Sequence, residues 1–442
     1  MHHHVAQHSR PLLAIAGVAL AAVALAGCTG GGAPAASAGD TIRVQVETSK
    51  LPGMQAVADM FEAANPGTSV VLETITSDQK STTNALTLAA DGAPDLGVAP
   101  INANSYQQLL AGDALLSLDD VWTASDLGNV LAPDVVSTLT APDGQHYAAL
   151  FEQTIYNTVY YNEDVFQQAG ITAPEDHAVT TDGQLLDIVK KLNDAGHDGL
   201  CIGGSSNYQL GWLLDGQLAA LSTPEELDAF NTAATSDGDV DFTSAPFVDS
   251  LSQIQSWYDA GVFQPGMLGQ NFDTALANFV AGTCGMLLGG ATTTTALTAD
   301  NTTFAYDWFL LPSANGSTLP TRYAGSTFVI PKTAANPDLA KKFLEFFYQT
   351  DSELAYVGAN GSLPAIQGLP TDKLKEVLPE TAASILEYTE ANGAGTGWTS
   401  VLPGALGQGF IDPEIQKQLA GQQSPEQTAQ AEQDNYLSFL SK

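Results

Sequence analysis

Hydrophobic and polar positions in the first part of the chain predict alternating strands and helices. The alternating, β-branched segment 41–46 predicts one strand and segment 69–76 a second. Between them, Met54, Val57 and Phe61 recur at helical spacing. Strands that alternate with helices build a parallel sheet, whose ligands bind beyond the carboxyl ends of the strands. The pattern therefore predicts an α/β fold.

The segment 144–170 changes from extended to helical sequence. It is β-branched and aromatic up to Tyr161, turns helical at Glu163, and reaches Gly170, where a C-cap glycine is expected. Its middle carries polar or amphipathic residues where a buried strand would be apolar: Glu152, Gln153, Tyr156 and Asn157. We interpret the segment as a strand that crosses between two lobes.

The later segments continue the alternation and bring two aromatic residues to one place. Segment 199–204 predicts a short strand, and the next helix begins with Tyr208 and Trp212 in its first turns. Their i, i+4 spacing puts both rings on one helical face, as core residues or as a platform for a sugar. Asn102 follows a short buried strand, where it is either a ligand contact or an ordinary loop residue.

The N-terminal residues 1–27 have the pattern of a secretory signal peptide. Arg10 and several histidines precede an apolar run that is shorter than the roughly 20 residues of a spanning helix. The run ends in Leu-Ala-Gly-Cys28, which resembles a bacterial lipobox with a lipid-bearing cysteine; an ordinary cleavage site is the alternative. Residues 28–39 are rich in glycine, alanine and serine and predict a flexible, lipid-anchored tether on the extracellular face of the membrane.

Composition limits the classes of partner. The chain has 14 lysine and arginine residues against 49 aspartate and glutamate residues, a formal net charge of -35 at pH 7. Such a surface repels nucleic acid and anionic lipid headgroups, so neither is expected as a partner. A chain of 442 residues is longer than a single hydrophobic core can support, which predicts two lobes in the mature chain.

Motifs for catalysis or metal binding are missing from the sequence. His146, His177 and His197 lack paired spacing, and no nucleophile elbow, P-loop or dinucleotide fingerprint occurs. We therefore predict no enzyme activity, cofactor or metal. Cys201 and Cys284 lie in apolar segments, either as buried free thiols, which are the commoner outcome, or as a disulfide between neighbouring strands.

A series of short motifs spans nearly the whole mature chain. In order they are 91–95 (DGAPD), 116–120 (LSLDD), 160–170 (YYNEDVFQQAG), 279–286 (FVAGTCGM), 325–331 with the helical segment 338–345, and 361–364 (GSLP). This series resembles the extracellular solute-binding proteins of ABC importers, the maltose-binding-like, carbohydrate-type group (family 1).

The resemblance implies a type II periplasmic-binding-protein-like fold, with two α/β lobes whose parallel-core sheets are joined by three crossover segments. The first crossover falls in 144–170, the second near 323–326 and the third near 360–363. The implied lobes are 40–150 plus 322–360 at the N-terminal side and 151–321 plus 361–442 at the C-terminal side.

The resemblance also implies a ligand site in the cleft. Carried over by position, its residues are Glu47, Lys50, Asn102, Gln153, Tyr156, Asn157, Tyr208, Trp212, Gly325, Ser326 and Trp398. Amides and carboxylates suit sugar hydroxyls, and aromatic rings suit the apolar faces of pyranoses. The family often has a proline in the crossover where this chain has 149–151 (ALF), so the register of Gln153 and Asn157 stays open.

The implied function is capture of a sugar or oligosaccharide by closing lobes and its delivery to an ABC importer permease, by a monomer that meets the membrane only through its lipid. The alternatives are a non-sugar solute, such as a polyol, glycerophosphodiester or peptide, and a secreted carbohydrate-active enzyme. Phosphorylated ligands are disfavoured because only Arg43 and Arg322 remain as arginines after processing.

Overall fold

The computed structural model describes residues 40–76, 79–80, 83–101, 104–206, 208–236, 238–299, 302–313, 315–316 and 319–441. The predicted signal peptide, Cys28, the tether and Asn102 lie outside these residues. Within the described ranges, no helix combines the length and the apolar character that a membrane crossing needs.

The strands form two sheets. The parallel pairing predicted for the first two strands is confirmed, because Thr41 pairs with Ser69 and Glu47 with Ile75 in a two-stranded sheet. The second sheet has seven strands in the order β3-β8-β4-β6-β5, with β7 beside β4 and β9 beside β8. The strands are β1 (Thr41–Glu47), β2 (Ser69–Ile75), β3 (Gly97–Val98), β4 (Ala149–Asn162), β5 (Asp198–Cys201), β6 (Cys284–Gly290), β7 (Tyr306–Leu310), β8 (Thr321–Val329) and β9 (Gly395–Thr396).

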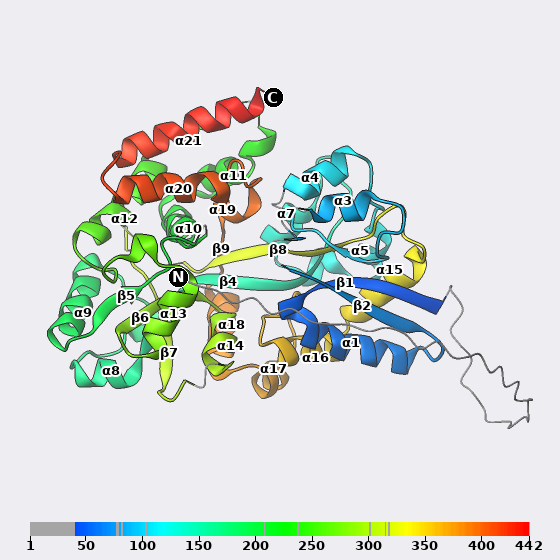
Figure 1. Cartoon of the computed structure of the whole chain (residues 1–442), viewed down its shortest axis with the longest axis horizontal. Coiled ribbons are helices and arrows are strands. Elements are labelled where there is room, and N and C mark those ends of the chain that lie inside the picture. Colours follow the sequence, from blue (N-terminus) through cyan, green and yellow to red (C-terminus); the bar gives the residue numbers. More distant parts are fainter. Residues whose placement is uncertain are drawn as a thin grey trace, which may run out of the picture. The chain divides into compact units, whose positions relative to one another are not determined.

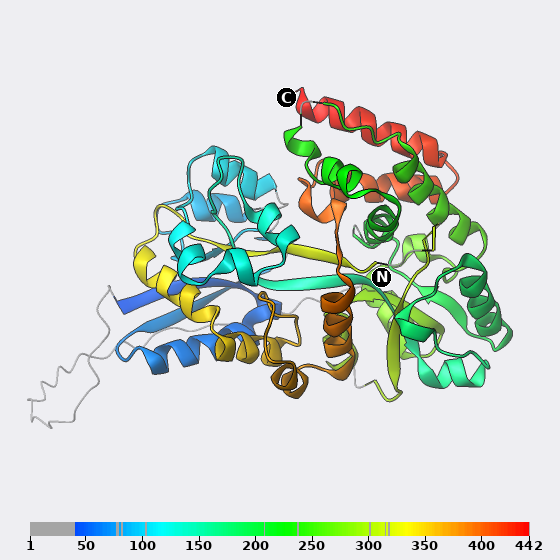
Figure 2. The same ribbon diagram turned by 180° about the vertical axis from the view of Figure 1, so that it is seen from behind.

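Helices cover both sheets, so the fold is a mixed α/β fold as predicted (Figures 1 and 2). Those of the first part are α1 (Leu51–Ala64), α3 (Asn84–Ala89), α4 (Asn104–Ala111), α5 (Asp119–Ala124), α6 (Leu127–Val130), α7 (Pro133–Leu139), α8 (Glu163–Gln168), α9 (Asp182–Asp194), α10 (Gln209–Leu221) and α11 (Pro224–Asn231). The later ones are α12 (Ala245–Asp259), α13 (Phe272–Val280), α14 (Thr293–Ala299), α15 (Pro337–Phe347), α16 (Thr350–Asn360), α17 (Thr371–Val377), α18 (Glu380–Asn392), α19 (Trp398–Val401), α20 (Gln408–Leu419) and α21 (Pro425–Leu440).

Strand β4 is the predicted crossing strand and the centre of the larger sheet. It is 14 residues long and pairs antiparallel with β6, β7 and β8. Figure 1 shows β4 and β8 running side by side between the two groups of helices. The strand is irregular at Asn157, whose φ of 66° lies in the left-handed region, where the register with β6 shifts between Tyr156 and Thr158.

Buried apolar side chains form two clusters. The first gathers residues from β1, α1, α5, α15 and α16, and the second gathers residues from α9, α10, α12, α20 and α21. Strand β4 contributes to both, with Ile155 in the first and Val159 in the second. The lobe boundaries inferred from the sequence remain a prediction.

One local expectation needs correction. Free thiols were the commoner expectation for Cys201 and Cys284, but these residues form a disulfide between the paired strands β5 and β6, with Cα atoms 5.8 Å apart. Helix α16 ends at Asn360, and Gly361, whose φ of 63° is the left-handed conformation of a C-cap, begins the motif 361–364.

Candidate functional site

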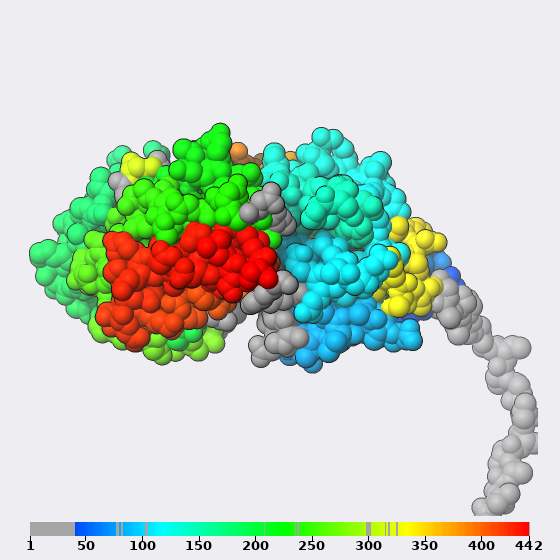
Figure 3. Space-filling model, turned by 90° about the horizontal axis from the view of Figure 1, so that it is seen from above, coloured from blue at the N-terminus to red at the C-terminus, as the bar shows by residue number. Residues whose placement is uncertain are grey.

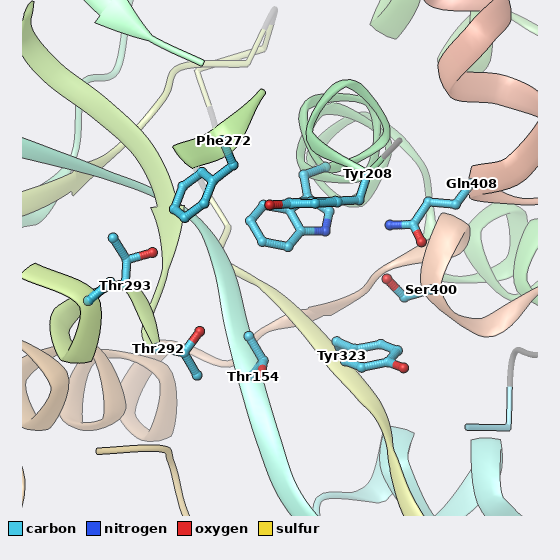
Figure 4. Close-up of a pocket in the computed structure, with 10 residues that line it drawn as sticks. Thr154, Tyr208, Phe272, Thr292, Thr293, Tyr323, Ser400 and Gln408 are labelled. Atoms are coloured by element: carbon cyan, nitrogen blue, oxygen red, sulfur yellow. The ribbon is translucent and has the colours of Figure 1, made fainter. Parts of the chain in front are cut away.

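A cavity of about 340 Å³ lies beside strands β4 and β8. We call it the first cavity. Its lining combines aromatic rings with small hydroxyl and amide side chains: Thr154, Tyr208, Trp212, Phe272, Thr292, Thr293, Ala296, Tyr323, Ser400 and Gln408. In Figure 4, Phe272 and Tyr208 lie on one side of the space, and Thr292, Thr154 and Tyr323 lie on the other. The cavity has the size and the mixed lining of a small-molecule site.

The floor of the first cavity comes from two paired strands. Thr154 on β4 is the register partner of Tyr323 on β8. Directly opposed residues of an antiparallel pair project from the same face of the sheet, so both side chains reach the cavity. The floor therefore offers a hydroxyl beside a phenol ring.

The aromatic wall is built on the start of α10. Trp212 lies 4.9 Å from Tyr208, measured between ring centroids, and its backbone N–H donates to the Tyr208 carbonyl over 2.9 Å. The Trp212 ring stacks on the buried Tyr156 ring at 4.8 Å, with 27° between the ring planes. Phe272 adds a further ring, 6.5 Å from Tyr208. Trp212 is therefore held from behind and keeps part of its surface toward the cavity.

Hydroxyl and amide groups complete the lining. Thr292 and Thr293 follow β6 after the single residue Ala291, and the Gly290 N–H donates to Thr293 Oγ1 over 3.1 Å. A side chain at Gly290 would put its Cβ 2.9 Å from the Ile155 carbonyl oxygen, so this glycine allows β6 to lie close to β4. On the opposite side, Ser400 comes from α19 and Gln408 from α20.

A buried carboxylate holds the aromatic wall and α19 together. The fully buried Asp215 accepts hydrogen bonds from the Tyr156 hydroxyl at 2.7 Å, from the Thr399 N–H at 2.8 Å and from Thr399 Oγ1 at 2.5 Å. Tyr156 Oη also lies 2.9 Å from Ser400 Oγ. Burial raises the pKa of Asp215 to about 7, although the hydrogen bonds from Thr399 and Tyr156 act in the opposite direction.

A second buried aspartate, Asp412, contacts helix α10. Asp412 on α20 accepts a hydrogen bond from the Gly211 N–H at 3.0 Å. Burial raises the pKa of Asp412 to about 7, and the charge of Asp215 acts in the same direction. These two carboxylates tie α10, α19 and α20 together behind the first cavity.

A second cavity, of about 450 Å³, lies between α4 and α7 on one side and α11 and α19 on the other. Ser400 lines the first cavity and the adjacent Val401 lines the second. Figure 3 shows the helices near the C-terminus, in red and orange, on one side and the cyan segment that includes α4 and α7 on the other. Asp134 borders this second cavity and forms an ion pair with the buried Arg322 at 2.5 Å.

Two of the predicted site residues, Tyr208 and Trp212, line the first cavity, and Tyr156 lies directly behind them. Asn157 is buried beside α10, where its Nδ2 donates to Thr321 Oγ1. Gly325 lies within β8.

A separate network around the buried Glu152 brings other predicted residues together. Lys50 Nζ forms an ion pair with Glu152 Oε1 at 2.7 Å, and Ser326 Oγ donates to the same oxygen over 3.3 Å. Glu47 forms an ion pair with Lys80 at 2.5 Å. None of the predicted residues Glu47, Lys50 and Ser326 is among those that line the first cavity.

Gln153 and Trp398 are not among the residues that line the first cavity. Gln153 Oε1 accepts a hydrogen bond from Arg322 over 2.9 Å, and its neighbour Thr154 lines the first cavity instead. Trp398 is fully buried in the second cluster, 5.5 Å from Phe242 and 5.3 Å from Phe247 between ring centroids. In this structure Trp398 is a core residue.

Sequence reasoning missed most of the polar lining. Thr292 and Thr293 follow a Gly-Gly strand end, and the rule that ligands bind beyond strand ends could have indicated them. Phe272, Ser400 and Gln408 carry no such signal, because only the packing of α13, α19 and α20 brings them here.

The chemistry of the first cavity suits binding more than bond cleavage. Its lining offers rings for apolar faces and neutral hydroxyl and amide groups for hydrogen bonds. Across the described ranges, no group of three or more histidine, cysteine, aspartate or glutamate residues could hold a metal ion.

Comparisons with known proteins identify the relatives of this chain. The model of a protein family described as "Bacterial extracellular solute-binding protein" matches residues 46–353. A relative from Pyrococcus horikoshii, named an uncharacterized ABC transporter extracellular-binding protein, is 22% identical over 375 residues, which cover 81% of each chain.

Solved structures share the fold at low sequence identity. A chitin oligosaccharide binding protein superposes with a TM-score of 0.73 at 19% identity, over 91% of this chain and 99% of the other. An ABC substrate-binding protein from Listeria monocytogenes, in complex with cycloalternan, gives a TM-score of 0.70 at 18% identity, again over 91% and 99%. The fold is therefore that of type II periplasmic-binding-protein-like solute-binding proteins.

Proposed function

Because the chain belongs to the bacterial extracellular solute-binding protein family, we propose that it captures a sugar or oligosaccharide in the first cavity and delivers it to an ABC importer permease. The observation that carries the proposal is the lining itself. Three aromatic rings, of Tyr208, Trp212 and Phe272, adjoin neutral hydroxyl and amide groups, which is the combination that the two faces of a pyranose require.

The similar structures support the choice of ligand class. Those neighbours include a chitin oligosaccharide binding protein and proteins in complex with raffinose and with cycloalternan. In the proposed cycle, the segments 40–150 plus 322–360 and 151–321 plus 361–442 act as lobes that close on the ligand, because a ligand that contacts both favours the closed population.

The lipid anchor belongs to the same proposal. The lipobox-like end at Cys28 and the small-residue tether after it support attachment to the extracellular face of the membrane. A Cys28→Ala variant should be released into the medium, whereas the native protein should partition with membranes; equal partitioning of both would contradict the anchor.

Thermal unfolding in the presence of mono- and oligosaccharides tests the ligand class. A bound ligand adds RT ln(1 + [L]/Kd) to the free energy of unfolding, so a ligand at 100 times its Kd adds about 2.7 kcal/mol and raises the midpoint. If no carbohydrate raises the midpoint, the sugar assignment fails while family membership is unaffected.

Substitution of Trp212 tests the location. Trp212→Ala should weaken sugar binding at least about tenfold, because a large ring contact is lost. Tyr258 is a half-buried aromatic residue of α12 outside the cavity, so Tyr258→Ala is the control. Equal sugar affinity of the Trp212→Ala variant and the native protein would place the site elsewhere.

A further inference from the structure

We propose that the first cavity selects uncharged sugars and rejects the corresponding acidic sugars, such as uronic acids. This inference rests on the proposed function, since it concerns which sugars the same cavity accepts. A carboxylate that leaves water needs a cation as well as hydrogen-bond donors in exchange, and without the cation its burial costs free energy.

The first cavity offers no such cation. Its described lining contains no lysine, arginine or histidine. Thr154, Thr292, Ser400 and Gln408 are neutral, and they can donate to sugar hydroxyls but carry no charge to balance a carboxylate. Burial raises the pKa of Tyr208 to about 12, so its phenol is neutral at physiological pH.

The cations of the chain are engaged elsewhere. Arg10 and Lys442 lie outside the described residues, and each of the other lysines and arginines except Lys342 forms an ion pair. Lys342 is exposed on α15 and lines neither cavity. Recruiting one of the paired cations to an anionic ligand would leave a carboxylate without its partner.

Lys50 and Arg322 show this pairing next to the crossing strands, because Lys50 contacts a residue of β4 and Arg322 lies on β8. Lys50 is paired with the buried Glu152 at 2.7 Å. Arg322 is paired with Asp134 at 2.5 Å, and its Nε donates to Gln153 over 2.9 Å. Both cations are therefore occupied by partners within the chain.

Carboxylates lie behind the lining, although none is part of it. Asp215 lies behind Tyr156, and the pKa of the lining residue Tyr323 is raised by burial and further by the charges of Glu47 and Glu152. Glu152 is paired with Lys50 and Glu47 with Lys80, so no cation near these carboxylates is free to accept an anionic ligand.

The second cavity has the same character. Asp134 and Asp228 line it, together with hydroxyl and amide groups, and no lysine or arginine occurs among its described lining residues. A longer acidic sugar that extended past α19 would thus meet no lysine or arginine among those lining residues either.

The test compares matched ligands by isothermal titration calorimetry. The probes are galactose and glucose with their uronic acids and the methyl esters of those acids, at one pH and ionic strength. In the galactose set or the glucose set, the neutral sugar or the methyl ester should bind at least about tenfold more tightly than the uronic acid. A tenfold ratio of affinities corresponds to a difference of about 1.4 kcal/mol in binding free energy. The ester separates charge from shape, because it restores neutrality while keeping the extra carbonyl group.

An added cation should reverse the discrimination. Gln408→Lys places an ammonium group in the lining, and it should reduce the ratio of neutral to acidic affinity at least about tenfold. Gln422→Lys, at an exposed position after α20, makes the same change of net charge away from the cavity and should leave the ratio unchanged. Thr292→Lys is the second variant if Gln408→Lys does not fold.

The outcomes separate the two proposals. Uronic acids that bind as tightly as their neutral counterparts overturn the selectivity and leave sugar capture unaffected. A folded Gln408→Lys or Thr292→Lys variant with an unchanged ratio of neutral to acidic affinity has the same consequence. If a wider neutral panel with cellobiose, raffinose and chitobiose also fails to bind, sugar capture is refuted and the selectivity falls with it.

Discussion

Gly397 lies against the base of the aromatic wall and has no room for a side chain. A Cβ there would lie 1.5 Å from Tyr156 Oη and 3.0 Å from Asp215 Oδ2. Gly397→Ala should therefore lower the free energy of unfolding by about 1–3 kcal/mol, the usual cost of overpacking, and weaken sugar binding by displacing Tyr156. Denaturant unfolding and ligand-induced thermal shifts measure the two effects.

The control for this change is Gly404→Ala. Gly404 lies in the turn between α19 and α20, and a Cβ added there would meet no neighbouring atom within 4 Å. If the two alanine variants are equally stable, the close packing around Tyr156 is not a constraint on the fold.

Asp412 should make stability depend on pH. Its pKa rises from 3.8 to about 7 on burial, so between these values the folded protein holds a proton that the unfolded chain has released. Its contribution to stability is complete below about pH 4 and is lost as the pH rises toward 7. Relative to the native protein, Asp412→Asn should therefore gain about 1–3 kcal/mol as the pH rises from 4 to 8.

Unfolding midpoints of both proteins across this pH range measure the gain. Asp59→Asn, at an exposed position of α1, is the matched control. A stability difference between Asp412→Asn and the native protein that stays constant from pH 4 to 8 would contradict the buried proton.

Single residues also mark the limit of what the sequence predicts. The closeness of Tyr208 and Trp212 could be predicted from their i, i+4 spacing, although Tyr208 is the N-cap of α10 and not part of its first turn. Gln153 is carried over by position from the family resemblance, which does not include the register shifts on β4 between Leu150 and Thr154. The neighbouring Thr154 lines the first cavity. The burial of Trp398 depends on helices distant in sequence, which local pattern cannot reveal.

At the scale of elements, the disulfide joins β5 to β6 across 83 residues of sequence. The cross-link restricts the unfolded chain, so removal of the disulfide should lower the free energy of unfolding by about 2–4 kcal/mol. A reductant should lower the unfolding midpoint of the native protein but not that of the Cys201→Ser, Cys284→Ser double variant. Equal midpoints of native protein with and without reductant, once mass spectrometry shows free thiols, would contradict this.

The pair of Asp134 and Arg322 connects α7 to β8. Arg322 is 5% exposed, so removal of its partner leaves a buried charge, and Asp134→Ala should cost about 3–5 kcal/mol in equilibrium unfolding. Asp194→Ala breaks the exposed pair with Lys190 on α9 and should change stability by less than about 1 kcal/mol. Similar losses in both variants would show that burial of Arg322 is unimportant.

Elements were more predictable than their junctions. The parallel pairing of β1 and β2 and the strand-to-helix change at Asn162 followed from apolar periodicity and from β-branched sequence. The pairing of β8 with β3, β4 and β9 could not be predicted, because partners distant in the chain are chosen by packing.

At the scale of the whole molecule, charge and fold act together. The net charge of -35 and the ion-paired cations disfavour anionic solutes, a cost that a neutral sugar does not meet. Strand β4 supplies residues to both apolar clusters, so a movement of one cluster relative to the other must be accommodated along β4 and β8.

The position of Trp212 gives the protein a built-in optical reporter. Of its five tryptophans, Trp122, Trp257, Trp308 and Trp398 are buried, whereas Trp212 lines the first cavity. A bound sugar should thus change the emission of one fluorophore over a constant background from four others. Titration of a neutral sugar should give a saturable change in intensity that Trp212→Phe removes, so that occupancy can be followed without a label.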